Sequence, residues 1–167
     1  AHCCHYGAEL GVRCVIIPST ATVHSAYGAV ASDLHYSFEL SELMRTPPFS
    51  EQPARYLEPG RIERCFRELE ERGRDVLHRS GIPEDRRIMR RKADLRYRRQ
   101  THEVMVPVPA GPLGEEEMER LVELFEKRYE ELYGKGSAYR EAGLEITAFR
   151  VEAIGRTIKP ALKGHLP

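Results

Sequence analysis

Hydrophobic periodicity divides the longer part of the chain into helices and strands. Apolar side chains recur at helical spacing in residues 62–77 and again in 118–132, which predicts two amphipathic helices. Three further stretches, 87–100, 102–108 and 144–154, alternate between apolar and polar residues, as strands with one buried face do. The order helix, strand, strand, helix, strand predicts an α+β fold, with a layer of helices on a largely antiparallel sheet.

The alternation also predicts which side chains share the face that packs on the helices. Residues that alternate with the apolar ones are predicted to point away from the helices. They include Arg96 in the first strand and Phe149 in the third. The apolar faces comprise Met89, Ala93, Leu95 and Tyr97, then His102, Val104, Val106 and Val108, then Leu144, Ile146 and Ala148. In the second helix the inward residues are predicted to be Met118, Leu121, Val122, Phe125, Tyr129 and Leu132.

The first part of the chain has a different pattern. Residues 1–10 are helical in character and end at Gly11, and residues 13–17 form a β-branched run typical of a strand buried on both faces. Small residues then predict a closely packed helix over 25–32, with Ser25 as its N-cap. This αβα pattern is typical of the end of an α/β domain.

Proline sets the expected division of the chain. Residues 46–60 are rich in proline, which fixes its own φ and disfavours helix in the residue before it. We therefore predict a first domain over 1–45, a linker over 46–60 and an α+β domain over 61–167. Because the chain begins at Ala1 directly in helical sequence, we expect further sequence upstream of it.

Composition narrows the functional class. The 26 basic and 26 acidic residues balance, so the chain has no general attraction for nucleic acid, and no apolar run approaches the roughly 20 residues that span a bilayer. The four cysteines match no disulfide framework, which favours reduced thiols in a cytoplasmic protein. The cluster His2–His5 carries metal-ligand types, but a tetrahedral site needs ligands from another segment, so no metal is expected.

Two other clusters are candidates for chemical sites. The basic run 86–99 can bind an anion, or it can pair with the acidic residues of 115–131. His102 and Glu103 are adjacent in a predicted strand and so point to opposite sides of the sheet, which argues against a catalytic dyad. The chain also has no phosphate-binding P-loop, no Gly-x-Gly-x-x-Gly turn and no His-Glu-x-x-His motif. The residues by themselves therefore define no self-contained active site.

Three stretches together resemble the hydantoinase A/5-oxoprolinase family. Residues 2–12, ending in Leu-Gly-Val, lead into Val-Ile-Ile-Pro at 15–18, and residues 23–33 read Val-His-Ser-Ala-Tyr-Gly-Ala-Val-Ala-Ser-Asp. Residues 93–107 are similar to the family pattern Arg-Tyr-x-Gly-Gln-x-x-Glu-Leu-x-Val-Pro, with Arg99 in place of the glycine. Glycine allows backbone conformations that arginine does not. The positions that match the family motifs are Ser25, Gly28, Asp33, Arg96, Tyr97, Gln100 and Glu103.

The resemblance implies a larger enzyme of which this chain is the C-terminal portion. The family includes hydantoinases, 5-oxoprolinases and subunits of acetone and acetophenone carboxylases, and residues 1–45 would be the tail of an actin-like ATPase domain. We expect the parent to hydrolyse a cyclic amide by phosphorylating the amide oxygen, with ATP, magnesium and a second subunit. This chain alone is expected to bind no cofactor and to be inactive. The alternatives are a ketone carboxylase subunit and a non-catalytic assembly module.

Overall fold

The computed structural model describes residues 2–160 of the 167-residue chain, and these residues fall into two compact units. Residues 33–156 form the larger unit, and residues 2–32 with 157–160 belong to the smaller one. The family-like motif 93–107 lies in the larger unit. The motif 23–33 lies in the smaller unit except for Asp33, the first residue of the larger unit. The larger unit therefore holds most of the positions that match the family motifs.

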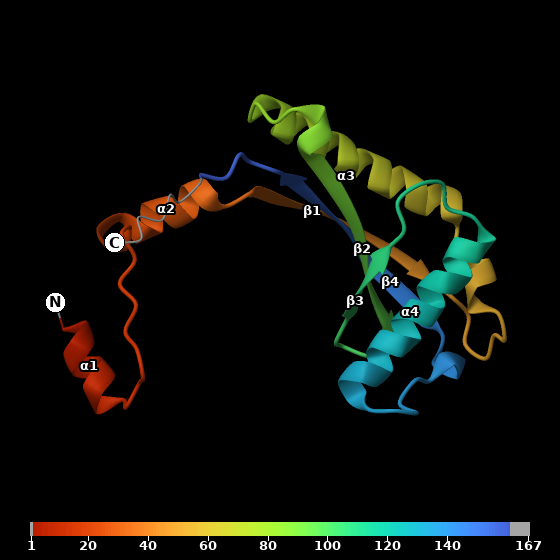
Figure 1. Cartoon of the computed structure of the whole chain (residues 1–167). Coiled ribbons are helices and arrows are strands. Elements are labelled where there is room, and N and C mark those ends of the chain that lie inside the picture. Colours follow the sequence, from red (N-terminus) through yellow and green to blue (C-terminus); the bar gives the residue numbers. More distant parts are fainter. Residues whose placement is uncertain (1, 161–167) are drawn as a thin grey trace. The chain divides into compact units, whose positions relative to one another are not determined.

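A four-stranded antiparallel sheet is the framework of the larger unit (Figure 1). Its strands are β1 (Leu34–Arg45), β2 (Arg87–Tyr97), β3 (Val104–Val108) and β4 (Leu144–Gly155). They lie in the order β1-β4-β2-β3, and every neighbouring pair is antiparallel. The predicted α+β class is therefore confirmed, together with the three strands that the alternation indicated.

Two long helices pack on one face of this sheet. Helix α3 (Pro59–Arg79) contacts β1, β2 and β4, and helix α4 (Glu115–Tyr133) contacts β3. The core between helices and sheet includes an edge-to-face pair of Phe66 with Phe149, whose ring centroids are 5.2 Å apart. Gly73 lets α3 approach the sheet closely, because a Cβ there would lie 3.0 Å from the Ala153 Cβ. The predicted apolar faces of both helices are thus buried, apart from the last turn of α4.

A β-bulge in β4 changes which of its residues face the core. Asp94 pairs with Ala148 while the next residue of β2, Leu95, pairs with Ile146, so Thr147 is an extra residue in the ladder. The extra residue reverses the alternation beyond it, and Phe149 joins Ile146 in the core. The predicted placement of Ala148 with Ile146 and of Phe149 on the opposite face was therefore wrong.

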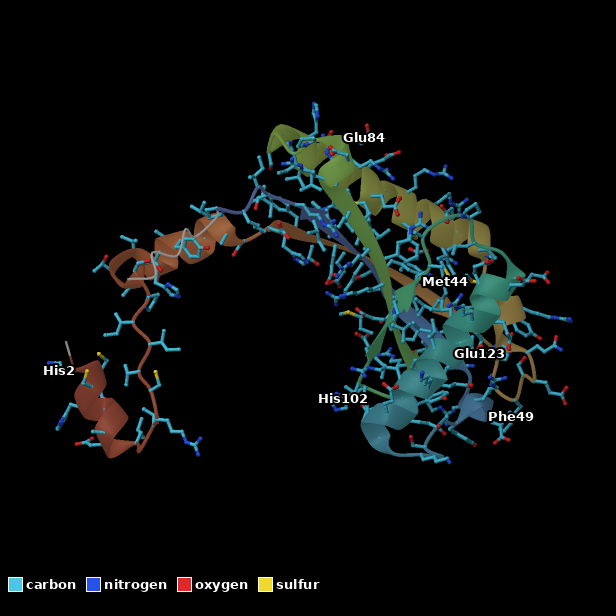
Figure 2. The ribbon with its side chains drawn as sticks, viewed as in Figure 1. His2, Met44, Phe49, Glu84, His102 and Glu123 are labelled. Carbon is cyan, nitrogen blue, oxygen red and sulfur yellow. The ribbon has the colours of Figure 1, made fainter. Side chains whose placement is uncertain are left out.

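Two other inward predictions were wrong because the apolar pattern extends beyond the part of the element that packs on the core. Val104, Val106 and Val108 are buried as predicted, but β3 begins only at Val104, and His102 is exposed in the turn before it (Figure 2). The buried face of α4 likewise ends at Tyr129, and Leu132 in the last turn is 53% exposed.

Strand β1 was not predicted, although its sequence carries the signal. Leu34, Tyr36, Phe38 and Leu40 alternate with polar residues, and β1 pairs with β4 along most of its length. After β1 the proline-rich stretch forms a 3₁₀ turn, Pro53–Tyr56, that contacts α4. Pro53 and Ala54 of this turn and the following Leu57 are buried.

The smaller unit contains the two helices predicted for it, α1 (Cys3–Glu9) and α2 (His24–Ala31). Residues 13–17 form no strand, and Ile16 is 85% exposed, so the prediction of a buried strand was wrong. A strand needs a neighbour to satisfy its backbone hydrogen bonds, and no described segment pairs with these residues. Ser25 is the second residue of α2 and Val23 precedes the helix as its cap, so the N-cap prediction was also wrong.

Candidate functional site

The face of the sheet opposite α3 and α4 carries several ion pairs between neighbouring strands. Arg150 of β4 lies between two carboxylates, with its Nε 2.7 Å from Asp94 of β2 and its Nη1 2.6 Å from Glu39 of β1. Lys92 pairs with Glu152 in the same way across β2 and β4. Because each cation bridges neighbouring strands, the charges on this face are largely neutralised within the sheet.

Glu145 is the centre of a separate group of ion pairs on this face, which includes the motif residue Arg96. Its carboxylate accepts hydrogen bonds from the Nε of Arg45 at 2.9 Å and the Nε of Arg96 at 2.8 Å. Burial alone would raise the pKa of Glu145, but the hydrogen bonds and charges of Arg96 and Arg45 outweigh burial and lower it. Glu103 lies 3.9 Å from the Nη1 of Arg96. The structure therefore brings the motif positions Arg96 and Glu103 together.

Tyr97 and Gln100 lie on the helix-covered side of the sheet. The Tyr97 ring packs edge-to-face on Phe125 and Tyr129 of α4, at centroid distances of 5.0 and 4.9 Å. Gln100 donates a hydrogen bond from Nε2 to the Tyr129 hydroxyl at 2.8 Å. These two motif residues join the β2–β3 hairpin to α4, and their contacts are those of a packing junction.

The Tyr97 hydroxyl is unusual among the described polar groups. It is buried and makes no hydrogen bond of normal geometry, and Tyr97 as a whole is 1% exposed. Burial, reinforced by the nearby charge of Glu126, raises the pKa of Tyr97 to about 12. The backbone of Tyr139 lies near the hydroxyl and acts in the opposite direction. The phenol is therefore a neutral donor at physiological pH.

The remaining motif positions lie elsewhere in the chain. Ser25 and Gly28 are in α2 of the smaller unit, where the Gly28 carbonyl accepts a hydrogen bond from the Ser32 hydroxyl at 2.7 Å. Asp33 directly precedes β1. The seven positions thus belong to two units. Among the described residues, Arg96 contacts Glu103, and the Gln100 backbone N–H donates to the Tyr97 carbonyl at 3.1 Å.

Three members of the basic run, Arg91, Lys92 and Arg96, are neutralised by acids other than those the sequence indicated. Arg91 is buried against α3, where its Nε lies 2.6 Å from Glu70 and its Nη1 lies 3.1 Å from Glu63. No residue of 115–131 forms an ion pair with this run among the described side chains. Sequence reasoning missed Glu145 and Glu152 as partners, because cross-strand pairing is set by register between segments far apart in sequence.

Three wider features of the described residues concern metal binding, membrane association and thiol chemistry. No group of three or more His, Cys, Asp and Glu side chains within residues 2–160 is arranged to hold a metal ion. No helix in this range is long and apolar enough to cross a membrane. All four cysteines are free thiols.

Comparison with known proteins identifies the family. Residues 51–165 match the hydantoinase/oxoprolinase C-terminal domain, and the chain belongs to this family. The resemblance seen in the three sequence motifs is therefore confirmed.

Two curated relatives match nearly the whole chain. The caprolactamase subunit alpha of Pseudomonas jessenii is 25% identical over 164 residues, which cover 96% of this chain and 22% of that protein. The acetone carboxylase beta subunit of Xanthobacter autotrophicus is 23% identical over 167 residues, covering 99% of this chain and 23% of that protein. The chain thus spans less than a quarter of the length of these relatives, which are both subunits of larger enzymes.

Solved structures of the same two kinds of enzyme share the fold. The nucleotide-free structure of an acetone carboxylase, described as ATP-dependent, superposes with a TM-score of 0.80 at 21% identity, over 93% of this chain and 22% of that one. The ATP-dependent caprolactamase of Pseudomonas jessenii superposes with a TM-score of 0.71 at 24% identity, over 95% of this chain and 22% of that one.

Proposed function

We propose that this chain is the C-terminal portion of a subunit of an ATP-dependent enzyme that hydrolyses a cyclic amide. The observation that carries the proposal is the match to the caprolactamase alpha subunit over 96% of the chain, together with membership of the hydantoinase/oxoprolinase C-terminal domain family. In such a reaction, ATP phosphorylates the amide oxygen and makes the carbonyl carbon electrophilic enough for attack by water.

ATP and magnesium are proposed to bind to other parts of the parent enzyme. The described residues offer no cluster of metal ligands, and the sequence has no glycine-rich phosphate loop, so the residues present do not fit either group. We accordingly derive no catalytic step from this chain. The smaller unit would be the end of the actin-like ATPase domain, whose phosphate loops would lie upstream.

Within the parent, this chain is proposed to act as an assembly module. The exposed apolar side chains of residues 10–17, including Leu10 and Ile16, would pack on the upstream part of the same subunit. The ion-paired face of the sheet has Arg150 and Glu39 at its surface, and a second subunit would dock there through hydrogen bonds to these partly exposed groups. Cytoplasmic localisation follows as part of the same proposal.

The first experiment is an assay of the full-length parent with its neighbouring subunit. We expect magnesium-dependent release of ADP coupled to ring opening of hydantoin, 5-oxoproline or caprolactam, and no activity from the 167-residue chain alone. The second candidate is a ketone carboxylase, which the similarity to the acetone carboxylase beta subunit supports. It would replace the amide hydrolase if ADP release required bicarbonate together with acetone or acetophenone. Turnover by the isolated chain would refute the assembly role.

A charge reversal tests the docking face. Arg150→Glu places a third acid beside Asp94 and Glu39, and we expect it to weaken co-elution with the neighbouring subunit in size-exclusion chromatography. Arg67→Glu is the matched control, because Arg67 is exposed on α3 and makes no ion pair with any described residue. If both variants co-elute with the neighbouring subunit as well as the wild-type chain does, the partner binds elsewhere.

A further inference from the structure

A pocket of about 330 Å³ opens where three loops meet at the end of β2. The loop after β1 contributes Phe49, the β2–β3 turn contributes Arg98 and Arg99, and the segment before β4 contributes Tyr139 and Glu141. Phe49 is marked in Figure 2. The pocket lies on neither of the two surfaces proposed for assembly, and its volume is in the range of small-molecule sites.

The walls of the pocket are held in place without any ligand. The Phe49 backbone N–H donates to the Glu141 carbonyl at 2.8 Å, and the Arg98 N–H donates to the Gly143 carbonyl at 2.9 Å. Gly143 has a φ of 77°, and a Cβ there would lie 2.9 Å from the Thr46 carbonyl oxygen. Because only glycine fits at this junction, the three loops keep a fixed spacing and the pocket is preformed.

The backbone is strained at two points of the lining. Phe49 and Arg99 have φ values of 57° and 69°, and they are the only non-glycine residues with positive φ in the described chain. Residues other than glycine and asparagine rarely adopt a positive φ. Backbone strain of this kind is concentrated at binding sites. The Phe49 ring is 78% exposed, so burial of the ring does not compensate for the strain.

The lining also contains polar groups without partners. The side chains of Arg98 and Arg99 make no hydrogen bond or ion pair with any described residue, whereas nearby Arg140 is held by both oxygens of Glu126 at 2.6 Å. Tyr97 lines the same pocket, and its buried hydroxyl makes no hydrogen bond of normal geometry. Glu141 is the single acid among the lining residues, which leaves one excess positive charge.

We propose that this pocket binds a small organic carboxylate with a flat apolar body. Arg98 and Arg99 would pair with the carboxylate, since guanidinium groups recognise carboxylates through paired charge-assisted hydrogen bonds. The exposed rings of Phe49 and Tyr139 would contact the apolar body. A single negative charge fits best, because Glu141 would repel the second charge of a phosphate.

The test compares three probes on the 167-residue chain by isothermal titration calorimetry at low ionic strength. Benzoate is expected to bind saturably with one site per chain. Benzamide has the same shape without the charge, and inorganic phosphate has charge without the apolar body, and each is expected to bind at least about tenfold more weakly. Binding of benzamide as tight as that of benzoate, phosphate binding as tight as that of benzoate, or no benzoate binding would overturn the proposal.

Variants locate the site and separate binding from folding. Arg98→Gln and Arg99→Asn are each expected to lower benzoate affinity about tenfold. Asparagine is chosen at position 99 because it tolerates positive φ. Arg67→Gln on α3 is the control and should leave the affinity unchanged. Glu141→Gln removes the repelling charge and should tighten binding several-fold, a gain that misfolding cannot produce. Unchanged affinity in the three pocket variants would place the site elsewhere and refute the assignment.

Discussion

The buried Tyr97 hydroxyl makes the free energy of unfolding of this protein fall with rising pH in the alkaline range. Its pKa is about 12 in the folded chain, against 10.0 for an unperturbed tyrosine. The folded state therefore holds the phenolic proton more tightly than the unfolded state does. The associated stabilisation is fully present below pH 10 and is lost as the pH rises towards 12, where the unfolded chain ionises first. A hundredfold difference in proton affinity corresponds to roughly 3 kcal/mol.

This loss can be isolated by comparison with Tyr97→Phe. The free energy of unfolding would be measured by urea titration from neutral pH to about pH 12, for both proteins. By pH 12 the wild-type chain should have lost roughly 2 kcal/mol more than the variant, because the folded chain is then only half ionised at Tyr97. At neutral pH the variant should be at least as stable as the wild type, because it removes a buried donor that has no partner. Parallel pH profiles for the two proteins would refute the reasoning.

Three further substitutions test the packing and the ion pairs, each by urea unfolding. Gly73→Ala should destabilise the fold by about 1–3 kcal/mol, because the added Cβ would lie 3.0 Å from the Ala153 Cβ. Gly60→Ala on the same helix is the control, since its Cβ would meet nothing within 4 Å and should stabilise slightly. Equal effects of the two substitutions would contradict the close approach of α3 to the sheet. Arg91→Gln leaves the buried Glu70 and the half-buried Glu63 partly unpaired and should cost about 3 kcal/mol, with Arg67→Gln near neutral as its control. The lowered pKa of Glu145 stabilises the folded state at pH values above the pKa of this residue in the unfolded chain, and the stabilisation is lost as the pH falls through its pKa in the folded chain. Glu145→Gln should therefore reduce the loss of stability at acid pH. An unchanged loss of stability at acid pH would exclude this contribution.

The turn at Arg99 connects the sequence motif to its structural cause. The family pattern often has glycine at this position, and the structure gives Arg99 a φ of 69°, a conformation that glycine adopts without strain. The departure from the family pattern therefore keeps the backbone shape of the turn and adds a guanidinium at the rim of the pocket. A feature that is only a mismatch in the sequence becomes, in the fold, a difference in the chemistry of the lining.

Much of the local structure was predictable because it depends on residues close together in the chain. The apolar stripes of α3 and α4 and the alternation in β2 and β3 predicted both helices and both strands. The alternation from Leu34 to Leu40 is as regular as theirs and is sufficient to predict β1 as well. The three motifs also sufficed to indicate the family to which the chain belongs.

Periodicity and motif spacing are local properties of the chain, so the sequence was sufficient to predict the fold class, the family and most helices and strands of the larger unit. Only the tertiary structure decided that Thr147 is a bulge that turns Phe149 into the core, and that Glu145 rather than α4 neutralises Arg96. It also decided that Phe49 and Arg99 meet at one pocket in strained conformations. Each of these depends on register or contact between segments far apart in the chain, and no pattern within one segment records which partner it will meet.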